Sequence, residues 1–298
     1  MSGPRVEALV VNWNGLGVIG PCLETLLASD YHGLSVTMVD NDSTDGSVDF
    51  VRDTFPAVRI IETGDNRGYA AGVNAGAGVA LDDGADYLFV LNNDVELAPE
   101  CVSRLVDAAS KRADAAFLGP LIYYHDRPDI IWSAGGRIGW WSGHIHHVGI
   151  RERDLGQYEG VRDVDYVTGC AALVSARAVR EIGLMDTGYY MYNEDTDWCV
   201  RASRAGFAVV CVGDARMWHK VSMSSGGGLT PFKIYHRIRS SFRFFSRHAR
   251  PWHWLGIAPS TAARSFVFFV SQLMKGSGRN AAAVARGAVD TLRNTPRG

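Results

Sequence analysis

Carboxylate and amide side chains that could bind a ligand or a metal ion follow several apolar runs of this sequence. The clearest run, Tyr87 to Leu91, leads directly into Asn92, Asn93 and Asp94. An apolar run of this length between polar residues is typical of a strand buried in a parallel sheet. Such sheets bind ligands beyond the carboxyl ends of their strands, which makes Asp94 a candidate ligand-binding residue. Taken alone, the triplet is better explained as a turn, or as the cap of a helix beginning near Pro99.

The same arrangement occurs after three other predicted strands. Asn12 follows Val6 to Val11, the acids Asp40 and Asp42 follow Leu34 to Val39, and Asp65 to Arg67 follow Val58 to Ile61. Helical patterns separate these runs, so we expect four βα units, a mostly parallel sheet covered by helices and hence an α/β fold. All four polar clusters should then lie at one edge of the sheet. This repetition weakens the explanation of Asp94 as a simple cap.

Two glycine-rich phosphate-binding motifs are missing from the sequence. Gly-x-Gly-x-x-Gly does not follow the first predicted strand, and Gly-x-x-x-x-Gly-Lys-Ser/Thr does not occur. These absences remove the main support for a dinucleotide-dependent oxidoreductase and for a P-loop enzyme. Acids gathered where a phosphate would bind indicate instead a diphosphate bridged by Mg²⁺ or Mn²⁺, because both ions prefer oxygen ligands.

A second group of acids begins a later helix. Glu194, Asp195 and Asp197 lie in its first turn, where the helix dipole favours each acid by about 0.3–1 kcal/mol. That preference explains one or two acids. It does not explain the preceding aromatic run, Tyr189 to Tyr192, which would surround a carboxylate with apolar walls and tune its basicity.

Three further segments contain candidate residues. Val164 to Ser175 is predicted to be a buried strand with Thr168 and Gly169 in its middle, where glycine often marks the close approach of a ligand. The segment 132–160, rich in Gly, Trp and His, is predicted to be a loop region over the site. Its histidines alternate as in a strand, but no Cys or His partner at a usual spacing supports a zinc site. His219, just beyond the predicted strand Phe207 to Val212 and beside Ser224 to Gly228, is a candidate metal or phosphate ligand.

The composition suits one large globular domain or a domain with an appendage, with 298 residues, 47% of them hydrophobic. The five cysteines are scattered, which favours free thiols in a reducing cytoplasm. We expect no signal peptide, and the longest apolar stretch, Ser265 to Met274, is too short to span a bilayer.

The formal net charge of −2 hides an asymmetry. From Lys233 onward there are twelve Lys or Arg and one acid, a charge of +11, whereas the preceding residues have a charge of −13. In this basic part aromatic residues alternate with arginines, a pattern that suits a membrane interface with anionic lipid at about 1 kcal/mol per basic residue. A helical appendage packed on the acidic body explains it equally well. Nucleic-acid binding is disfavoured, because the rest of the chain is acidic and has no nucleic-acid motif.

The order of these motifs resembles the inverting glycosyltransferases of family 2, which have the GT-A fold, and among them the bacterial rhamnosyltransferase-like branch. The matching pieces span about residues 6 to 225 and are Val10-Val-Asn-Trp-Asn14, Val39-Asp-Asn-Asp-Ser-Thr-Asp-Gly-Ser47, Asn66-Arg-Gly-Tyr-Ala-Ala-Gly-Val-Asn74, Leu91-Asn-Asn-Asp94, Asp165-Tyr-Val-Thr-Gly169, Tyr192-Asn-Glu-Asp195 and His219. Each piece is common by itself, whereas their order is specific to the family. The resemblance implies a GT-A domain over 1–230, with a nucleotide-sugar half (1–98) and an acceptor half (99–230), and a helical basic extension over 231–298.

The resemblance also implies roles for individual residues. Asp40 would recognise the pyrimidine base, Asp94 would hold Mg²⁺ or Mn²⁺ on the donor diphosphate with His219, and Asp195, beside Glu194, matches the catalytic base. Asn92 stands where the family has the first acid of its Asp-x-Asp motif, so this chain has one carboxylate fewer. The implied nucleotide-sugar-binding residues are Asn12, Asn14, Asp40, Asp42, Asn66, Arg67, Gly68, Asn74, Asn92 and Asn93. The implied acceptor-binding residues are Trp140, Trp141, Thr168, Gly169, Tyr192 and Trp198.

The implied reaction is transfer of a sugar, with rhamnose as one candidate, from a dTDP- or UDP-sugar to an acceptor hydroxyl. The reaction needs a base for that hydroxyl and a cation for the leaving group. A polyprenyl-linked saccharide of cell-wall or surface-polysaccharide assembly, another glycan and a soluble secondary metabolite all remain open as acceptors. So do a homodimer and a place in the cytoplasm or on the inner face of the cytoplasmic membrane. The alternative is a nucleotide-sugar-binding protein without transferase activity, which Asn92 favours and Asp195 opposes.

Overall fold

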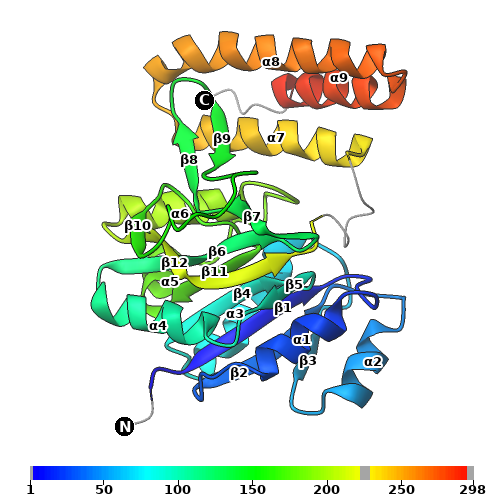
Figure 1. Ribbon diagram of the computed structural model, residues 1–298. Helices are drawn as coiled ribbons and strands as arrows, with labels where there is room; N and C mark the ends of the chain where they lie inside the picture. Colours follow the sequence, from blue (N-terminus) through cyan, green and yellow to red (C-terminus); the bar gives the residue numbers. More distant parts are fainter. Residues whose placement is uncertain (1–2, 222–228, 294–298) are drawn as a thin grey trace. The chain divides into compact units, whose positions relative to one another are not determined.

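The computed structural model describes residues 3–221 and 229–293. The strands are β1 (Val6–Asn12), β2 (Leu34–Asp40), β3 (Arg59–Glu62), β4 (Tyr87–Asn92), β5 (Val95–Leu97), β6 (Ala115–Tyr124), β7 (Arg127–Ser133), β8 (Gly136–Gly139), β9 (His144–His147), β10 (Val161–Asp163), β11 (Ala171–Ser175) and β12 (Ala208–His219). The helices are α1 (Ile19–Leu27), α2 (Ser47–Thr54), α3 (Tyr69–Asp82), α4 (Cys101–Lys111), α5 (Ala176–Ile182), α6 (Glu194–Arg204), α7 (Pro231–His248), α8 (Trp254–Met274) and α9 (Gly278–Arg293), with a 3₁₀ turn, η1 (Pro251–His253). The protein therefore has the mixed α/β architecture, with C-terminal helices, that its sequence predicts (Figure 1).

The chain divides into two compact units, which we describe separately. The first contains residues 3–137, 147–187 and 194–221, and the second contains residues 138–146, 188–193 and 229–293.

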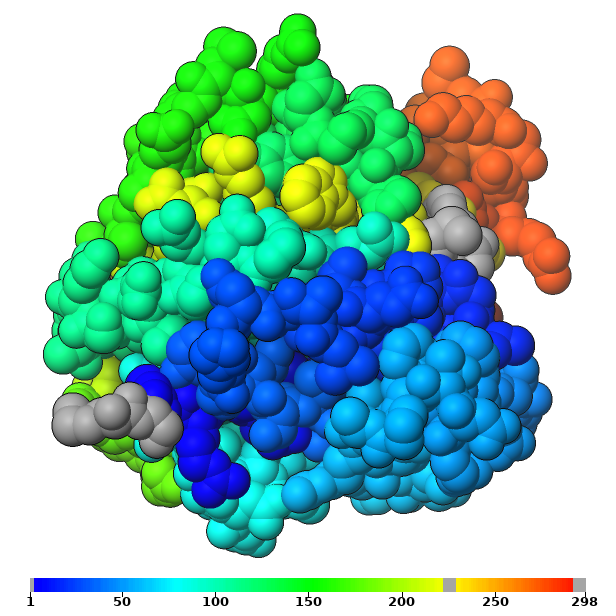
Figure 2. Space-filling model, turned by 60° about the horizontal axis from the view of Figure 1, so that its bottom comes forward, coloured from blue at the N-terminus to red at the C-terminus, as the bar shows by residue number. Residues whose placement is uncertain are grey.

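The first unit is built around a sheet of ten strands in the order β10-β12-β6-β11-β4-β1-β2-β3, with β5 paired to β12 and β7 to β6. The strands β3, β2, β1 and β4 are parallel neighbours, as the repeated βα pattern predicts. Helix α3 packs on β1 and β2, and α4 packs on β6 and β12. Figure 2 shows the first hundred residues, coloured blue to cyan, as one continuous surface of this unit.

The predicted strand at Tyr87 is β4, and Leu88 to Leu91 in it are completely buried. Its neighbours are β1, which is parallel, and β11, which is antiparallel; beyond β11, the strands β6 and β12 are parallel to each other. The register aligns Asn12 with Asp40 and Val11 with Asn92. The polar residues at the ends of β1, β2 and β4 are therefore level with one another at one edge, as expected.

Three predicted segments differ from the structure. The strand expected over Val164 to Ser175 is limited to β11, and Gly169 lies in a turn before it. The segment 132–160, expected to be a loop region, contains the paired strands β8 and β9. The strand expected to end at Val212 continues to His219, which is its last residue. The predicted Ser224 to Gly228 segment lies outside the described residues.

In the second unit, the three helices α7, α8 and α9 share a small core. Ile234, Ala283 and Val284 are buried there, and Phe268 and Phe269 pack against them. Thr230 caps α7, because its hydroxyl accepts a hydrogen bond from the backbone N–H of Lys233. Within the described ranges no helix is both long and apolar enough to cross a bilayer.

All five cysteines are free and buried. They lie in the first unit, in the core or next to it, and burial raises the pKa of the Cys22 thiol to about 12. They therefore behave as small apolar core residues rather than as reactive groups.

Candidate functional site

A buried hydrogen-bond network joins the carboxyl ends of β1, β2 and β4. Asn12 is at its centre: its Oδ1 accepts from Asn93 Nδ2 at 2.7 Å, and its Nδ2 donates to Asp40 Oδ1 at 2.9 Å. Ser43 donates to Asp40 twice, from its backbone N–H at 2.8 Å and from Oγ at 2.6 Å. Asn12, Asp40 and Asn93 are at most 3% exposed. Neutral donors therefore hold the Asp40 carboxylate in one orientation, because a buried carboxylate needs such partners.

The loops after β1 and β2 are tied to each other. Asn14 and Asp42 have φ angles of 48° and 64°, in the left-handed region that Asn and Asp adopt more readily than most residues. Asn14 Oδ1 accepts from the Thr44 N–H at 2.8 Å. A Cβ atom at buried Gly15 would lie 2.0 Å from Asn93 Nδ2, so the network itself requires glycine here. No pattern in the sequence indicates that Gly15 contacts this network.

The loop after β3 contributes residues that are more exposed than this network. Asn66 accepts a hydrogen bond from the N–H of Gly68, and the exposed Arg67 pairs with Asp65 at 2.9 Å. The Arg67 guanidinium is therefore accessible to an anionic ligand. Asn74 instead makes two hydrogen bonds with the backbone of Met185, which tie α3 to the segment before α6.

Asp94 and His219 meet at the same edge of the sheet. β5 and β12 pair antiparallel with Val95 opposite His219, and this register brings His219 Nε2 to 3.2 Å from Asp94 Oδ1. Both side chains are buried, and the ring of Trp132 stands edge-on to the imidazole at 4.7 Å.

This pair offers one oxygen and one nitrogen ligand to a cation. The Nδ1 atom of His219 has no hydrogen-bond partner among the described residues. Over the same residues, no group of three or more His, Cys, Asp or Glu side chains is arranged to hold a metal ion. The donor types fit a divalent ion that takes its remaining ligands from a phosphate-containing molecule and water.

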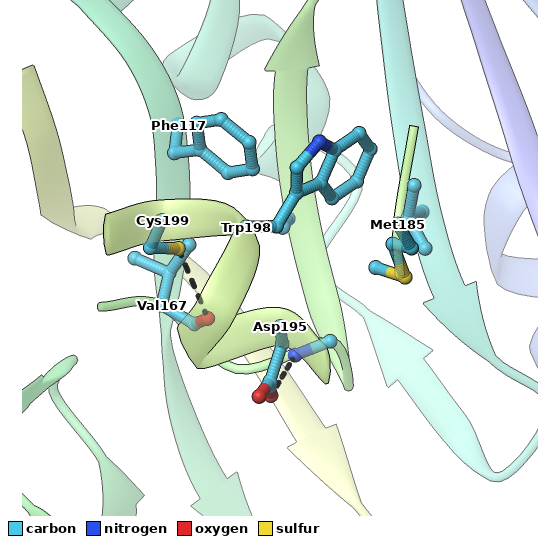
Figure 3. Close-up of a pocket in the computed structure, with 9 residues that line it drawn as sticks. Phe117, Val167, Met185, Asp195, Trp198 and Cys199 are labelled. Carbon is cyan, nitrogen blue, oxygen red and sulfur yellow. Dashed lines mark hydrogen bonds between the residues drawn. The ribbon is translucent and has the colours of Figure 1, made fainter. Parts of the chain in front are cut away.

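Asp195 is held at the start of α6 by three donors. The Gly169 N–H donates to Oδ2 at 2.8 Å, and Thr196 donates to Oδ1 from its N–H at 2.6 Å and from Oγ at 3.1 Å. Figure 3 shows Phe117, Trp198 and Met185 around a pocket that Asp195 also lines, with the Asp195 carboxylate directed away from Phe117 and Trp198. Burial raises the pKa of Asp195, although the donors from Gly169 and Thr196 oppose that shift. A raised pKa makes the carboxylate a stronger base near neutral pH.

Glu194, the first residue of α6, is buried. Burial, with a smaller contribution from the charge of Asp195, raises the pKa of Glu194 to about 8. Its Oε2 atom has no hydrogen-bond partner among the side chains and backbone that the structure describes. The buried Glu194 and the partly buried Asp195 therefore titrate as a pair, in which the hydrogen-bonded Asp195 is better able to carry the charge.

Tyr69 is a site residue that sequence reasoning missed. Its hydroxyl donates to the backbone oxygen of Gly169, whose N–H in turn donates to Asp195. The two residues of the first bond are 100 positions apart. Tyr69 follows Asn66 to Gly68 directly, so it links the loop after β3 to the carboxylate.

The predicted acceptor-binding residues fall in both units. Thr168, Gly169 and Trp198 belong to the first, whereas Trp140, Trp141 and Tyr192 belong to the second. Trp198 is 1% exposed and stands edge-on to Phe117 in the core behind Asp195, which speaks against contact with an acceptor.

In the second unit, Trp140 stacks on Phe244 with ring centroids 5.9 Å apart, and Trp141 is 58% exposed. The tyrosines expected around the carboxylate also lie there, with the Tyr189 ring under the guanidinium of Arg243 at 5.1 Å. Within the first unit, Val90, Phe117 and Val167 line the same pocket as Asp195.

Comparisons with known proteins show what this chain is similar to. The family model "Glycosyl transferase family 2" matches residues 8–183. An N-acetylglucosaminyl-diphospho-decaprenol L-rhamnosyltransferase of Mycobacterium tuberculosis (strain H37Rv) is 32% identical over 86% of this chain and 91% of its own length. A dTDP-rhamnosyl transferase of Shigella flexneri, RfbF, is 24% identical over 72% of each protein.

Solved structures show the same fold at low identity. A mannosyltransferase from Pyrobaculum calidifontis, in complex with GDP-Man and Mn²⁺, superposes with a TM-score of 0.61 and 16% identity, covering 97% of this chain and 87% of that one. GalNAc-T7 with UDP, GalNAc and Mn²⁺ also gives a TM-score of 0.61 at 16% identity, over 87% of this chain and 57% of that one.

Proposed function

Since the chain belongs to glycosyl transferase family 2 and is a glycosyltransferase, we propose that it transfers a sugar from a nucleotide-diphosphate donor to an acceptor hydroxyl with inversion at the anomeric carbon. The observation that carries this proposal is the partly buried Asp195 carboxylate, held by Gly169 and Thr196 beside the buried Glu194. One fixed base on the face opposite the leaving group is what an inverting displacement requires.

In this mechanism Asp195 takes the proton of the acceptor hydroxyl as its oxygen attacks the anomeric carbon. The three donors to Asp195 keep the carboxylate in place, and its apolar surroundings raise its basicity. Fixing the base in this way lowers the entropy cost of reaching the transition state. Glu194 in its protonated form would add no second negative charge near the attacking oxygen of the acceptor.

The donor would bind at the edge formed by β1, β2 and β4. We propose that Asp40, held by Asn12 and Ser43, contributes to recognition of the pyrimidine base, and that Arg67 contacts the donor. Asp94 and His219 would hold Mg²⁺ or Mn²⁺ on the diphosphate. Such an ion stabilises the charge that develops on the leaving nucleotide diphosphate.

For the substrates, we propose dTDP-rhamnose as donor and a polyprenyl-diphosphate-linked saccharide as acceptor, with the enzyme peripheral on the inner face of the cytoplasmic membrane. Support comes from the names of two relatives, one a rhamnosyltransferase for a decaprenol-linked substrate and the other a dTDP-rhamnosyl transferase. A cell-wall or surface-polysaccharide role follows from that acceptor class.

The test compares wild type with Asp195→Asn across dTDP-rhamnose, UDP-sugars and GDP-sugars. We expect the variant to bind the donor, as a thermal shift with Mn²⁺ would report, and to lose transfer. Thr196→Val is the matched control, because it removes one donor to Asp195 but keeps the carboxylate. An active, well-folded Asp195→Asn protein would contradict the role of Asp195. Donor binding by wild type without transfer to any acceptor would favour a sugar-nucleotide-binding protein instead.

A further inference from the structure

Helix α8, drawn in orange in Figure 1, has a wide face of exposed apolar side chains. Of its 21 residues only Ile257 and Gln272 are buried. Leu255, Phe266, Val267, Leu273 and Met274 are 79%, 67%, 66%, 50% and 84% exposed. We refer to these five residues as the α8 face. So much exposed apolar surface on one helix indicates a binding surface.

The α8 face is continuous along the helix. Leu255, Phe266 and Leu273 are separated by 11 and 7 residues, which returns them to one side at 3.6 residues per turn. The exposed Pro259 and Ala262 fill the space between Leu255 and Phe266. Arg264, the single charged residue of α8, points away from this side, because its guanidinium bonds Ser260 and the backbone oxygen of Gly143.

Basic residues lie at both ends of the face, and a tryptophan lies at one end. Before α8, Trp252 is half-exposed and the Arg250 guanidinium lies 5.2 Å from its ring centre. After α8 come Lys275 and Arg279, both exposed. An apolar helix face bordered by tryptophan and by arginine or lysine is typical of helices that lie in the plane of a bilayer.

The charge of this region decides between the candidate partners. The residues from Lys233 onward have a charge of +11, so a second copy of the chain would bring like charges together across the α8 face. An anionic bilayer offers both the apolar medium for Phe266 and Met274 and the negative charge for Lys275 and Arg279.

We infer that the α8 face docks on the surface of an anionic phospholipid bilayer, with the helix parallel to the membrane plane. This inference rests on the proposed function in one respect, since a lipid-linked acceptor gives the docking its purpose. The docking itself depends only on side chains between Arg250 and Arg279 and is measured without any substrate.

The test is co-sedimentation of the full chain with phosphatidylcholine vesicles and with vesicles that also contain phosphatidylglycerol. The probe variant combines Leu255→Gln, Phe266→Gln and Met274→Gln, substitutions that keep helix propensity. The matched control is Leu155→Gln, which removes an 82% exposed leucine from the first unit. Circular dichroism and light scattering record the fold and oligomeric state of each protein.

We expect wild type and Leu155→Gln to bind the phosphatidylglycerol vesicles equally. The triple variant should bind them at least about tenfold more weakly, because the loss of even one large apolar side chain from the membrane has an effect of this size. Lys275→Gln with Arg279→Gln should weaken binding to the anionic vesicles only. Equal binding by wild type and a folded triple variant would overturn the inference. So would a wild-type protein that binds no vesicles but forms a dimer that the triple substitution abolishes. Transfer to a water-soluble acceptor analogue should survive in the triple variant, so failure of docking and failure of the proposed function give different results.

Discussion

Tyr69→Phe should weaken catalysis without removing any group that touches the substrate. The change deletes the hydroxyl that donates to the Gly169 oxygen, and the Gly169 N–H holds Asp195 Oδ2 at 2.8 Å. A neutral hydrogen bond contributes about 0.5–1.5 kcal/mol net, and an unpaired buried carbonyl costs about 1–3 kcal/mol. We therefore expect a loss of stability of about 1–3 kcal/mol and a fall in kcat of about two- to tenfold.

The pH profile separates a positioning role from a purely structural one. The donor from Gly169 lowers the pKa of Asp195, so a displaced Gly169 should let that pKa rise. The base must be ionised to act, and the acidic limb of kcat/KM should therefore move to higher pH in Tyr69→Phe. The control is Tyr31→Phe, which removes a similar bond from a tyrosine hydroxyl to the Pro4 oxygen. If kcat and the acidic limb match wild type while stability falls, Tyr69 only supports the fold and the reasoning is refuted.

Three other changes test the rest of the site. Glu194→Gln should remove a pH dependence of stability. The pKa of Glu194 in the folded protein is raised from 4.5 to about 8, so wild type should lose stability as the pH rises through this window. Urea unfolding at several pH values should show this loss for wild type and not for the variant. Gly15→Ala should destabilise the protein by about 1–3 kcal/mol through overpacking, since the new Cβ atom would lie 2.0 Å from Asn93 Nδ2. The control is Gly17→Ala, whose Cβ atom meets nothing within 4 Å. Equal melting temperatures of the two variants would contradict the prediction. Transfer should stop in EDTA and return with Mn²⁺, and His219→Ala should need more Mn²⁺ for half-maximal rate; full activity in EDTA would exclude the ion.

The sequence predicted the parts of the fold that depend on local patterns. β4 follows from its apolar run, and the level polar ends of β1 and β2 follow from repeated βα units. The strand expected over Val164 to Ser175 was too long, because an apolar run does not reveal that its backbone turns at Gly169 and Cys170 before β11 begins. The strand ending at Val212 was too short, since Gly213 and Asp214 resemble a turn but form an irregularity between Val212 and Arg216, after which pairing with β6 resumes.

Contacts between distant residues could not be predicted in the same way. The bond from Gly169 to Asp195 joins residues 26 positions apart, and the bond from Tyr69 to Gly169 spans 100. Both depend on which strands become neighbours, and no local pattern records that. The family resemblance implied a common site for Asp94 and His219, but their 3.2 Å separation comes from the antiparallel register of β5 and β12.

The burial of all five cysteines gives the protein a practical property. Thiol-specific labels react with accessible thiolates, and burial keeps Cys22 and Cys211 protonated with pKa values raised to about 12. A cysteine introduced at an exposed position such as Val267 or Met274 should therefore react first in the folded protein. A spin label or fluorophore placed there could report its depth in a bilayer without prior removal of the native cysteines.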